Sequence, residues 1–456
     1  MTSQTRNIVL WVGTHIPFIA LLAWYLSVVG NIATRDNSYR SQIKEEYELL
    51  KASGDPMDFE MVKDAHFARA SEEDVDEWRK VFAEMETDSY LDSTVGIPLI
   101  DSPDPYNYRD YDFDVSPDWP SLAECDEFTQ KHADLIAKIR LLAAKEKNVR
   151  LASDFQSLKG DSIGMDELSA CVVLLTIDAQ VAVIKNESEQ VFQDVMALFD
   201  LSAHLQGSAF EMSVKAAAEA RGSAVLVLKK AIWGKLLTRT QMEEVVKECE
   251  KHIEFGEKWK RVVGEHRAFY VPNLTQVHSR DGVEKIGLSQ SRDLQDSALY
   301  LSIMRRAQQL DTSDWQEFIE ERGRLQMEIE TLAPPRDRYD FSVCRTAVPT
   351  LSRLAELFME DAQQCRLAIL AVQIQLEAEE VGNLPADIDS ILRNNPKLKP
   401  YGEKGFGYVL EKGTATLWGG EVNRNWDQTP LTVAEYKSEF TDMPPPAVVW
   451  RLRDVQ

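Results

Sequence analysis

The chain has 456 residues, 44% of them hydrophobic and 28% charged, which is enough for two or three folded units. Its net charge of −24 excludes nucleic acid as an expected partner, because phosphate binding requires a basic face. The same charge disfavours a body that lies on an anionic lipid surface. The five cysteines form no CxxC motif, and we expect Cys171, Cys249 and Cys365 to be small buried hydrophobes rather than parts of a disulfide framework.

The apolar run from Ile8 to Val29 is the one stretch that is long and apolar enough to span a bilayer. About 22 residues of helix extend roughly 33 Å, close to a hydrocarbon core about 30 Å thick. Trp11, Trp24 and Tyr25 lie toward its ends, where amphipathic rings favour the membrane interface, and Pro17 is placed to kink the helix. The sequence therefore predicts an anchor domain over residues 1–35.

We expect this anchor to be retained, because it is longer than the apolar part of a signal peptide and no A-x-A cleavage site follows it. Its orientation stays open on the residues alone. Arg6 precedes the span, while Arg35, Arg40 and Lys44 follow it, which leans slightly toward a cytoplasmic body. A short tail before a long domain is equally the layout of a signal-anchor that exports its C-terminal side.

Residues 36–120 are expected to form juxtamembrane helices and an acidic linker. The first helix continues from the membrane and carries an apolar stripe at Ile43, Tyr47 and Leu50. Ser71 has the spacing of an N-cap for a second helix, whose apolar face is Val75, Trp78, Val81 and Phe82. The linker over residues 96–120 is rich in aspartate, but the spacing does not match a calcium-binding loop, so we interpret it as a solvated acidic loop.

Residues 121–381 carry helical patterns joined by short connections, which predict an antiparallel bundle or a solenoid-like array. One helix is expected from Ser121 to about Lys147, and a break at Val271-Pro272-Asn273. Met165 to Ile184 is apolar on nearly every side and should be central. Because Asp178 and Gln180 interrupt this run, we do not interpret it as a second membrane span.

A long helix over Thr350–Val381 should end at Gly382, and a small α+β unit should occupy residues 382–456. Phe406–Leu410 and Thr414–Trp418 alternate with period two around Glu411-Lys412-Gly413, which predicts a β-hairpin. The tail after it is expected to be irregular and packed by Trp426 and Trp450. The expected fold class is thus mainly α, with a transmembrane helix, a helical array and a small C-terminal α+β unit.

Several short motifs lie toward the C-terminus, at Cys365-Arg366-Leu367-Ala368, Gly382-Asn383-Leu384-Pro385, Lys399-Pro400-Tyr401-Gly402, Phe406 to Leu410 and Leu417-Trp418-Gly419-Gly420. Together they resemble a family of uncharacterised single-pass membrane proteins common in planctomycetes and related bacteria. The family has no established activity, and the resemblance implies an anchored, extracytoplasmic, helical domain. The C-terminal helix and hairpin are also similar to major pseudopilins of type II secretion, although Lys399 stands where their turn aspartate would be.

No common catalytic or metal-binding motif occurs: HExxH, the P-loop, GxSxG, GxGxxG and Cys/His clusters are absent. We therefore expect no cofactor and no metal. The most concentrated polar cluster beside apolar sequence is Glu265-His266-Arg267. It fits either a buried ion-pair node, the more common case, or an acid–base pair.

These features predict a single-pass protein of the bacterial cell membrane with a periplasmic body, the orientation following the family resemblance. Three functions stay open. The first is a non-enzymatic helical scaffold that binds another protein. The second is a component of a secretion or pilus-like assembly. The third is an enzyme with a scattered site, in which Glu265 and His266 would be the first residues to mutate.

Overall fold

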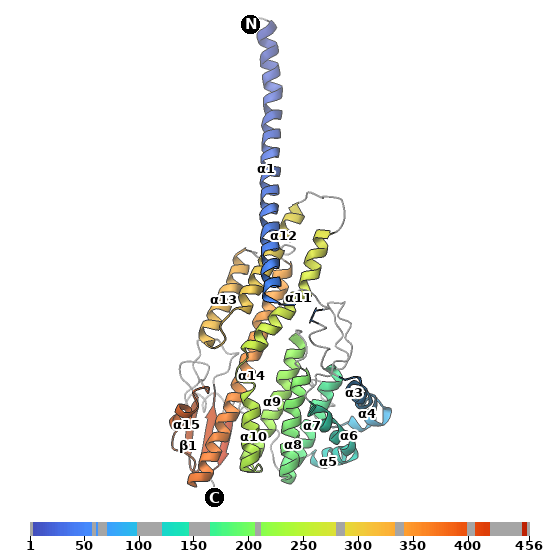
Figure 1. Ribbon diagram of the computed structural model, residues 1–456, viewed down its shortest axis with the longest axis vertical. Helices are drawn as coiled ribbons and strands as arrows, with labels where there is room; N and C mark the ends of the chain where they lie inside the picture. The colour runs from blue at the N-terminus through green and yellow to red at the C-terminus, as the bar shows by residue number, and fades with distance from the viewer. Residues whose placement is uncertain are drawn as a thin grey trace.

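The computed structural model describes residues 3–56, 61–62, 71–97, 121–145, 165–205, 211–279, 288–332, 342–398, 406–419 and 449–453. This part of the chain is mainly helical, with a small antiparallel sheet near the C-terminus. The molecule is elongated, and its two termini lie at opposite ends of the long axis (Figure 1). Both features of the predicted fold class, the helical body and the small C-terminal sheet, are confirmed.

The helices lie in the chain as follows: α1 (Ser3–Ser53), α3 (Glu72–Met85), α4 (Asp88–Thr94), α5 (Leu122–Lys131), α6 (Ala133–Ala143), α7 (Met165–Lys185), α8 (Ser188–Leu205), α9 (Glu211–Trp233), α10 (Arg239–Glu250), α11 (Gly256–Ser279), α12 (Leu288–Gln308), α13 (Trp315–Leu332), α14 (Ser342–Val381) and α15 (Asp389–Asn394). The strands are β1 (Gly407–Glu411), β2 (Thr414–Trp418) and β3 (Val449–Arg453).

Two hydrophobic cores follow one another along the long axis, and α14 contributes to both. The lower core in Figure 1 is built mainly from α3 to α10, the second half of α14, and the sheet. The upper core is built mainly from the end of α1, α11, α12, α13 and the first half of α14. Within α14, the buried residues from Cys344 to Ala362 belong to the upper core, and those from Cys365 to Ala378 to the lower core.

Helix α7 is the central helix of the lower core, as its apolar sequence predicts. Among the residues whose side chains the structure describes, which leave out residues 1–17, Asp166–Lys185 is the one helical segment that is long and apolar enough to cross a membrane, yet 78% of its apolar window is buried in the protein. It packs against α5, α8 and α9. All five cysteines are likewise buried and free, so the expectation of small buried hydrophobes is confirmed for Cys171, Cys249 and Cys365.

The single helix expected from Ser121 to Lys147 is wrong, because His132 divides it into α5 and α6. His132 has a non-helical backbone, and its Nε2 lies 2.9 Å from the Ser93 hydroxyl. Its ring also packs edge-on against Tyr90, with centroids 5.0 Å apart. Both partners come from the α4 region, which the sequence reasoning did not identify as a helix. A tertiary contact thus overrides the local helical pattern.

The break expected at Val271-Pro272-Asn273 is also wrong, since α11 continues to Ser279. Helix α14 likewise begins eight residues before the predicted Thr350 and passes through Pro349. A proline removes one backbone hydrogen bond, and packing against neighbouring helices can outweigh that loss in a long helix. The predicted end of α14 at Gly382 is confirmed by a left-handed backbone, with φ 88°.

The predicted hairpin is confirmed as β1 and β2, joined by Lys412 and Gly413, whose φ values of 51° and 76° are those of a type I′ turn. The expectation of an irregular tail is wrong for residues 449–453, which form β3 against β2. Trp450 pairs with Leu417 across this ladder and is buried, as expected, whereas Trp426 and the linker residues 98–120 lie outside the described residues.

Candidate functional site

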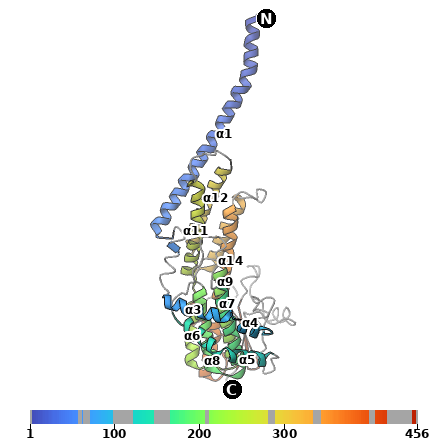
Figure 2. The ribbon, with the colours of Figure 1, turned by 90° about the vertical axis from the view of Figure 1, so that its right-hand side faces the viewer.

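The N-terminal half of α1 projects from the body as a free-standing helix (Figures 1 and 2). Six large apolar side chains on it are 47–64% exposed, namely Phe18, Leu21, Leu22, Trp24, Tyr25 and Leu26. The side chains of Ile8, Trp11 and Pro17 lie outside the described set, although their backbone belongs to the same helix. A contiguous apolar surface of this kind marks a site that contacts a membrane or another protein.

The second half of α1 docks on the body through the predicted apolar stripe. Leu50 is fully buried in the upper core, and Ile43 and Tyr47 pack against that core. The adjoining helix is α12, whose Arg305 makes a two-pronged ion pair with Glu46: Nε lies 2.7 Å from Oε2, and Nη2 lies 3.0 Å from Oε1. Apolar contact and a paired charge therefore attach α1 to the same neighbour.

A second ionic contact holds the end of α1, where Gly54 turns the chain with a φ of 74°. The Asp55 carboxylate then lies 3.1 Å from Nη2 of Arg267 on α11, and it accepts a 3.0 Å hydrogen bond from Nε2 of Gln308 on α12. Burial alone would raise the pKa of Asp55, but the Ser53 hydroxyl, the Arg267 charge and the Gln308 amide together hold this pKa below its ordinary value. Asp55 therefore stays ionised and joins the end of α1 to the middle of α11 and the end of α12.

The predicted polar cluster at Glu265, His266 and Arg267 is not one site. Glu265 accepts a 2.8 Å hydrogen bond from Nε of Arg261, four residues earlier on α11. His266 is buried, which lowers its pKa to about 4, and its Nδ1 lies 3.4 Å from the Tyr300 hydroxyl. Since Arg267 turns to Asp55, these consecutive side chains serve three separate contacts. These contacts match the ion-pair interpretation for Glu265 and Arg267.

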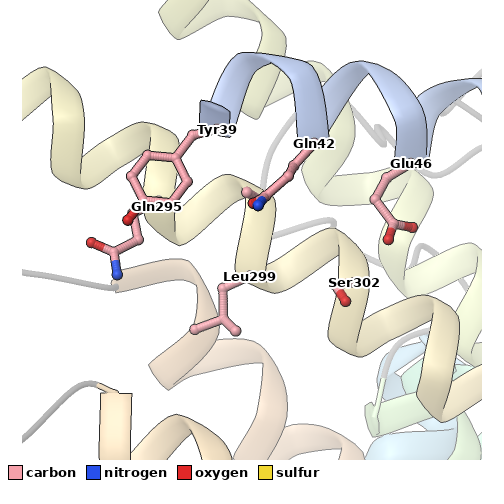
Figure 3. A pocket seen from close by; sticks show the side chains of 7 residues that line it. Tyr39, Gln42, Glu46, Gln295, Leu299 and Ser302 are labelled. Atoms are coloured by element: carbon pink, nitrogen blue, oxygen red, sulfur yellow. The ribbon is translucent and has the colours of Figure 1, made fainter. Parts of the chain in front are cut away.

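An open groove of about 290 Å³ lies between α1 and α12, above the Glu46–Arg305 contact. Figure 3 shows Tyr39, Gln42 and Glu46 of α1 facing Gln295, Leu299 and Ser302 of α12. The lining combines amide and hydroxyl groups and the Glu46 carboxylate with a small apolar floor. Such a surface can form hydrogen bonds to a polypeptide segment or another polar ligand.

The sequence reasoning missed a largely buried cluster of titratable side chains between the two cores, which we call the junction cluster: Arg221, Glu248, His252, Lys258 and Asp361. Nε of Arg221 lies 2.7 and 2.8 Å from the two carboxylate oxygens of Asp361, and its Nη1 lies 3.1 Å from the Ser202 hydroxyl. Lys258 donates a 2.9 Å hydrogen bond to Nδ1 of His252. These residues are distributed from α9 to α14, so no local spacing in the sequence predicts that they lie close together.

Within the part of the chain that the structure describes, no three His, Cys, Asp or Glu side chains are grouped so that they could hold a metal ion. Comparison of the chain with protein-family models, with curated proteins and with solved structures gives no match. These comparisons neither support nor contradict the resemblance to the planctomycete family.

Proposed function

We propose that the chain is a membrane-anchored helical scaffold of the cell envelope, in which Ile8–Val29 of α1 crosses the bilayer once. The observation that supports this most directly is the bare apolar surface from Phe18 to Leu26, which the body leaves uncovered. Covering six large apolar side chains is worth on the order of 10 kcal/mol, at roughly 1.5–3 kcal/mol for each fully buried one. A bilayer covers them on all sides of the helix at once.

The attachment of α1 supports a rigid tether rather than a flexible one. The same helix continues from the apolar segment to Ser53, with Leu50 buried in the upper core and Glu46 paired to Arg305. The orientation of the body would thus follow that of the membrane helix. The net charge of −24 would also keep the body away from anionic lipid and leave its sides open to a protein partner.

The membrane proposal is tested by placing two charges on the apolar segment. We expect the full chain to remain in the membrane pellet after alkaline carbonate extraction. The double variant Phe18→Arg/Leu22→Arg should shift to the supernatant, because each arginine near the centre of a span costs about 2.5–3.5 kcal/mol. Leu49→Arg is the matched control, since Leu49 is also exposed on α1 but lies on its docked half. Equal extraction of all three chains would refute the span.

The orientation is tested separately with a phosphatase fused to the C-terminus, an enzyme that is active only outside the cytoplasm. A periplasmic body predicts an active fusion. An inactive fusion that is nevertheless full-length would reverse the orientation, and would leave the anchor itself intact. Reproducible cross-linking of one envelope protein to the body, absent with an unrelated anchored domain, would identify the proposed partner; the absence of any such protein would contradict the scaffold.

The packing of α14 against β2 and β3 favours a component of a pilus-like assembly as the second candidate. A helix on a small sheet is the arrangement expected of a pseudopilin-like unit. Here, however, the apolar N-terminal helix is α1 and the helix under the sheet is α14, so the two are separate elements. Mass measurement in mild detergent distinguishes the two candidates. A component of a pilus-like assembly should form oligomers through α1, and a monomer at all concentrations would exclude this second candidate.

A further inference from the structure

Lys258 occupies the first turn of α11, at the level where the two cores meet. The connection from α10 to α11 contains His252, whose ring stacks on Phe199 of the lower core with centroids 5.9 Å apart. Phe255 follows in the same connection and belongs to the upper core. The Lys258 side chain is partly exposed between them. Lys258 therefore lies where the two cores meet, on a side chain that solvent partly reaches.

The polar partners of the Lys258 amine are neutral. Nζ donates to Nδ1 of His252 at 2.9 Å and to the backbone carbonyl of Lys251 at 3.3 Å. Among the described residues, the structure records no carboxylate in ion-pair contact with this amine. The neighbouring Lys260 differs, because its Nζ lies 2.9 Å from Glu257. An ammonium at position 258 thus gains hydrogen bonds but no compensating negative contact.

The His252 ring is held neutral and in one tautomer. Burial lowers the pKa of His252 to about 4. Since Nδ1 accepts from Lys258, the ring proton belongs on Nε2, which faces Oε1 of Glu248 at 3.6 Å. The ring is therefore an acceptor for an amine N–H, and it neither carries nor neutralises a positive charge.

The surroundings favour the uncharged form of Lys258. Burial is the largest cause that lowers the pKa of Lys258, and the nearby Arg221 guanidinium lowers it further. The carboxylates of Asp361 and Glu248 raise it in part, and the resulting pKa is about 8. At pH 7.5 about a quarter of such amines are free, against about one in a thousand for a lysine with the ordinary pKa near 10.5.

We propose that Lys258 is a nucleophilic amine that binds small aldehydes covalently and reversibly as an imine. The lone pair of the free amine attacks the carbonyl carbon, a C–N bond forms, and the carbonyl oxygen takes up a proton to give a carbinolamine. The hydroxyl then leaves as water with a proton from the nitrogen, so that amine and aldehyde yield imine and one water. A protonated imine keeps one N–H, which can still donate to Nδ1 of His252. The site is thus compatible with its product.

The experiment uses the full chain in mild detergent, with acetaldehyde as the probe and cyanoborohydride to reduce the imine. Mass spectrometry of Glu-specific digests then gives the rate of N-ethylation at each lysine. At pH 7.5 we expect Lys258 to react about 10-fold faster than Lys260, less than the ratio of free amine because a less basic amine is a weaker nucleophile. The Lys258 rate should level off above pH 8, while the Lys260 rate keeps rising.

Two variants isolate the cause. His252→Glu places a carboxylate beside the amine and should slow N-ethylation of Lys258 several-fold at pH 7.5, with Lys260 unchanged. Lys258→Arg should abolish the fast reaction and retain the helical circular dichroism spectrum. If His252→Glu does not fold, the pH profile of the natural chain decides alone. A Lys258 rate that equals that of Lys260, or that rises without a plateau to pH 9.5, would overturn the proposal.

Discussion

Removal of the Asp55 carboxylate tests the attachment of α1 to the body. Arg267 is fully buried, and Asp55→Ala would leave its charge without an ion-pair partner and the Gln308 amide without its acceptor. Breaking a buried pair costs about 3–5 kcal/mol, and we reduce this to about 2–3 kcal/mol because the Asp55 side chain is 23% exposed. The variant should therefore loosen the end of α1 and destabilise the upper core.

The assay combines a thermal melt in detergent with hydrogen exchange. A loss of about 2–3 kcal/mol lowers the melting temperature by roughly 4–12 °C for a unit of 150–250 residues. Exchange should accelerate in α1 from residue 43 to the helix end and in the facing part of α12, with little change in α7. Asp55→Asn keeps an acceptor for Gln308 and should show a smaller effect. Glu48→Ala is the control, because Glu48 is exposed on the same helix.

A melting temperature unchanged in Asp55→Ala would refute the reasoning that this contact carries stability. The pH dependence offers a second check on it. Because the pKa of folded Asp55 lies below its ordinary value of 3.8, its contribution is complete at neutral pH and is lost as the pH falls through the folded pKa. The difference between the natural chain and Asp55→Ala should therefore shrink in strong acid.

Three further predictions concern other parts of the fold. His252 and His266 have folded pKa values of about 4, below the ordinary 6.5, so the unfolded chain takes up protons at a higher pH than the folded chain does. The free energy of unfolding should therefore fall by up to about 3 kcal/mol per histidine as the pH drops from 6.5 to 4. His266→Gln should reduce this pH dependence in denaturant titrations. Gly407→Ala should destabilise the sheet severely, because a Cβ there would lie 1.9 Å from the Trp418 ring. Gly323→Ala on α13 has open space around the new Cβ and should stabilise the protein by about 0.5–1 kcal/mol. Thermal melts of the two variants should therefore shift in opposite directions. Trp78→Ala should cost about 3–5 kcal/mol in the same assay, since Trp78 is fully buried in the lower core, and a smaller loss would show that the core closes over the gap.

Sequence patterns predicted the helices and turns that depend only on residues close together in the chain. The stripe at Ile43, Tyr47 and Leu50 follows from helical periodicity, and the structure has it. The Lys412-Gly413 hairpin has the same origin. The contact of Asp55 with Arg267 joins residues that are about 210 positions apart, so nothing near either residue announces it. The sequence reasoning selected Arg267 as part of a polar cluster and could not identify Asp55 as its partner.

The failed expectations have tertiary causes. Val449–Arg453 becomes a strand because β2 offers it a free edge. Its buried Trp450 and Leu452 alternate with exposed Arg451 and Arg453, but this period-two pattern is only four residues long. The break at His132 depends on Ser93 and Tyr90 from another helix. The junction cluster is the clearest case, since Arg221 and Asp361 meet across 140 positions. Pairing of buried charges is selected by the folded geometry, and a single sequence does not reveal it.

The division of α14 between two cores has a consequence for synthesis in the cell. The ribosome completes α1 at residue 53 and reaches α14 at residue 342, so at about 5–20 residues per second the helix that both cores share arrives roughly 15–60 s after α1. During that interval the apolar faces of α9 and α12 have no α14 to cover them. A nascent chain with unfinished cores is a substrate for chaperones, and we expect its yield to depend on their supply more than on the stability of the finished fold.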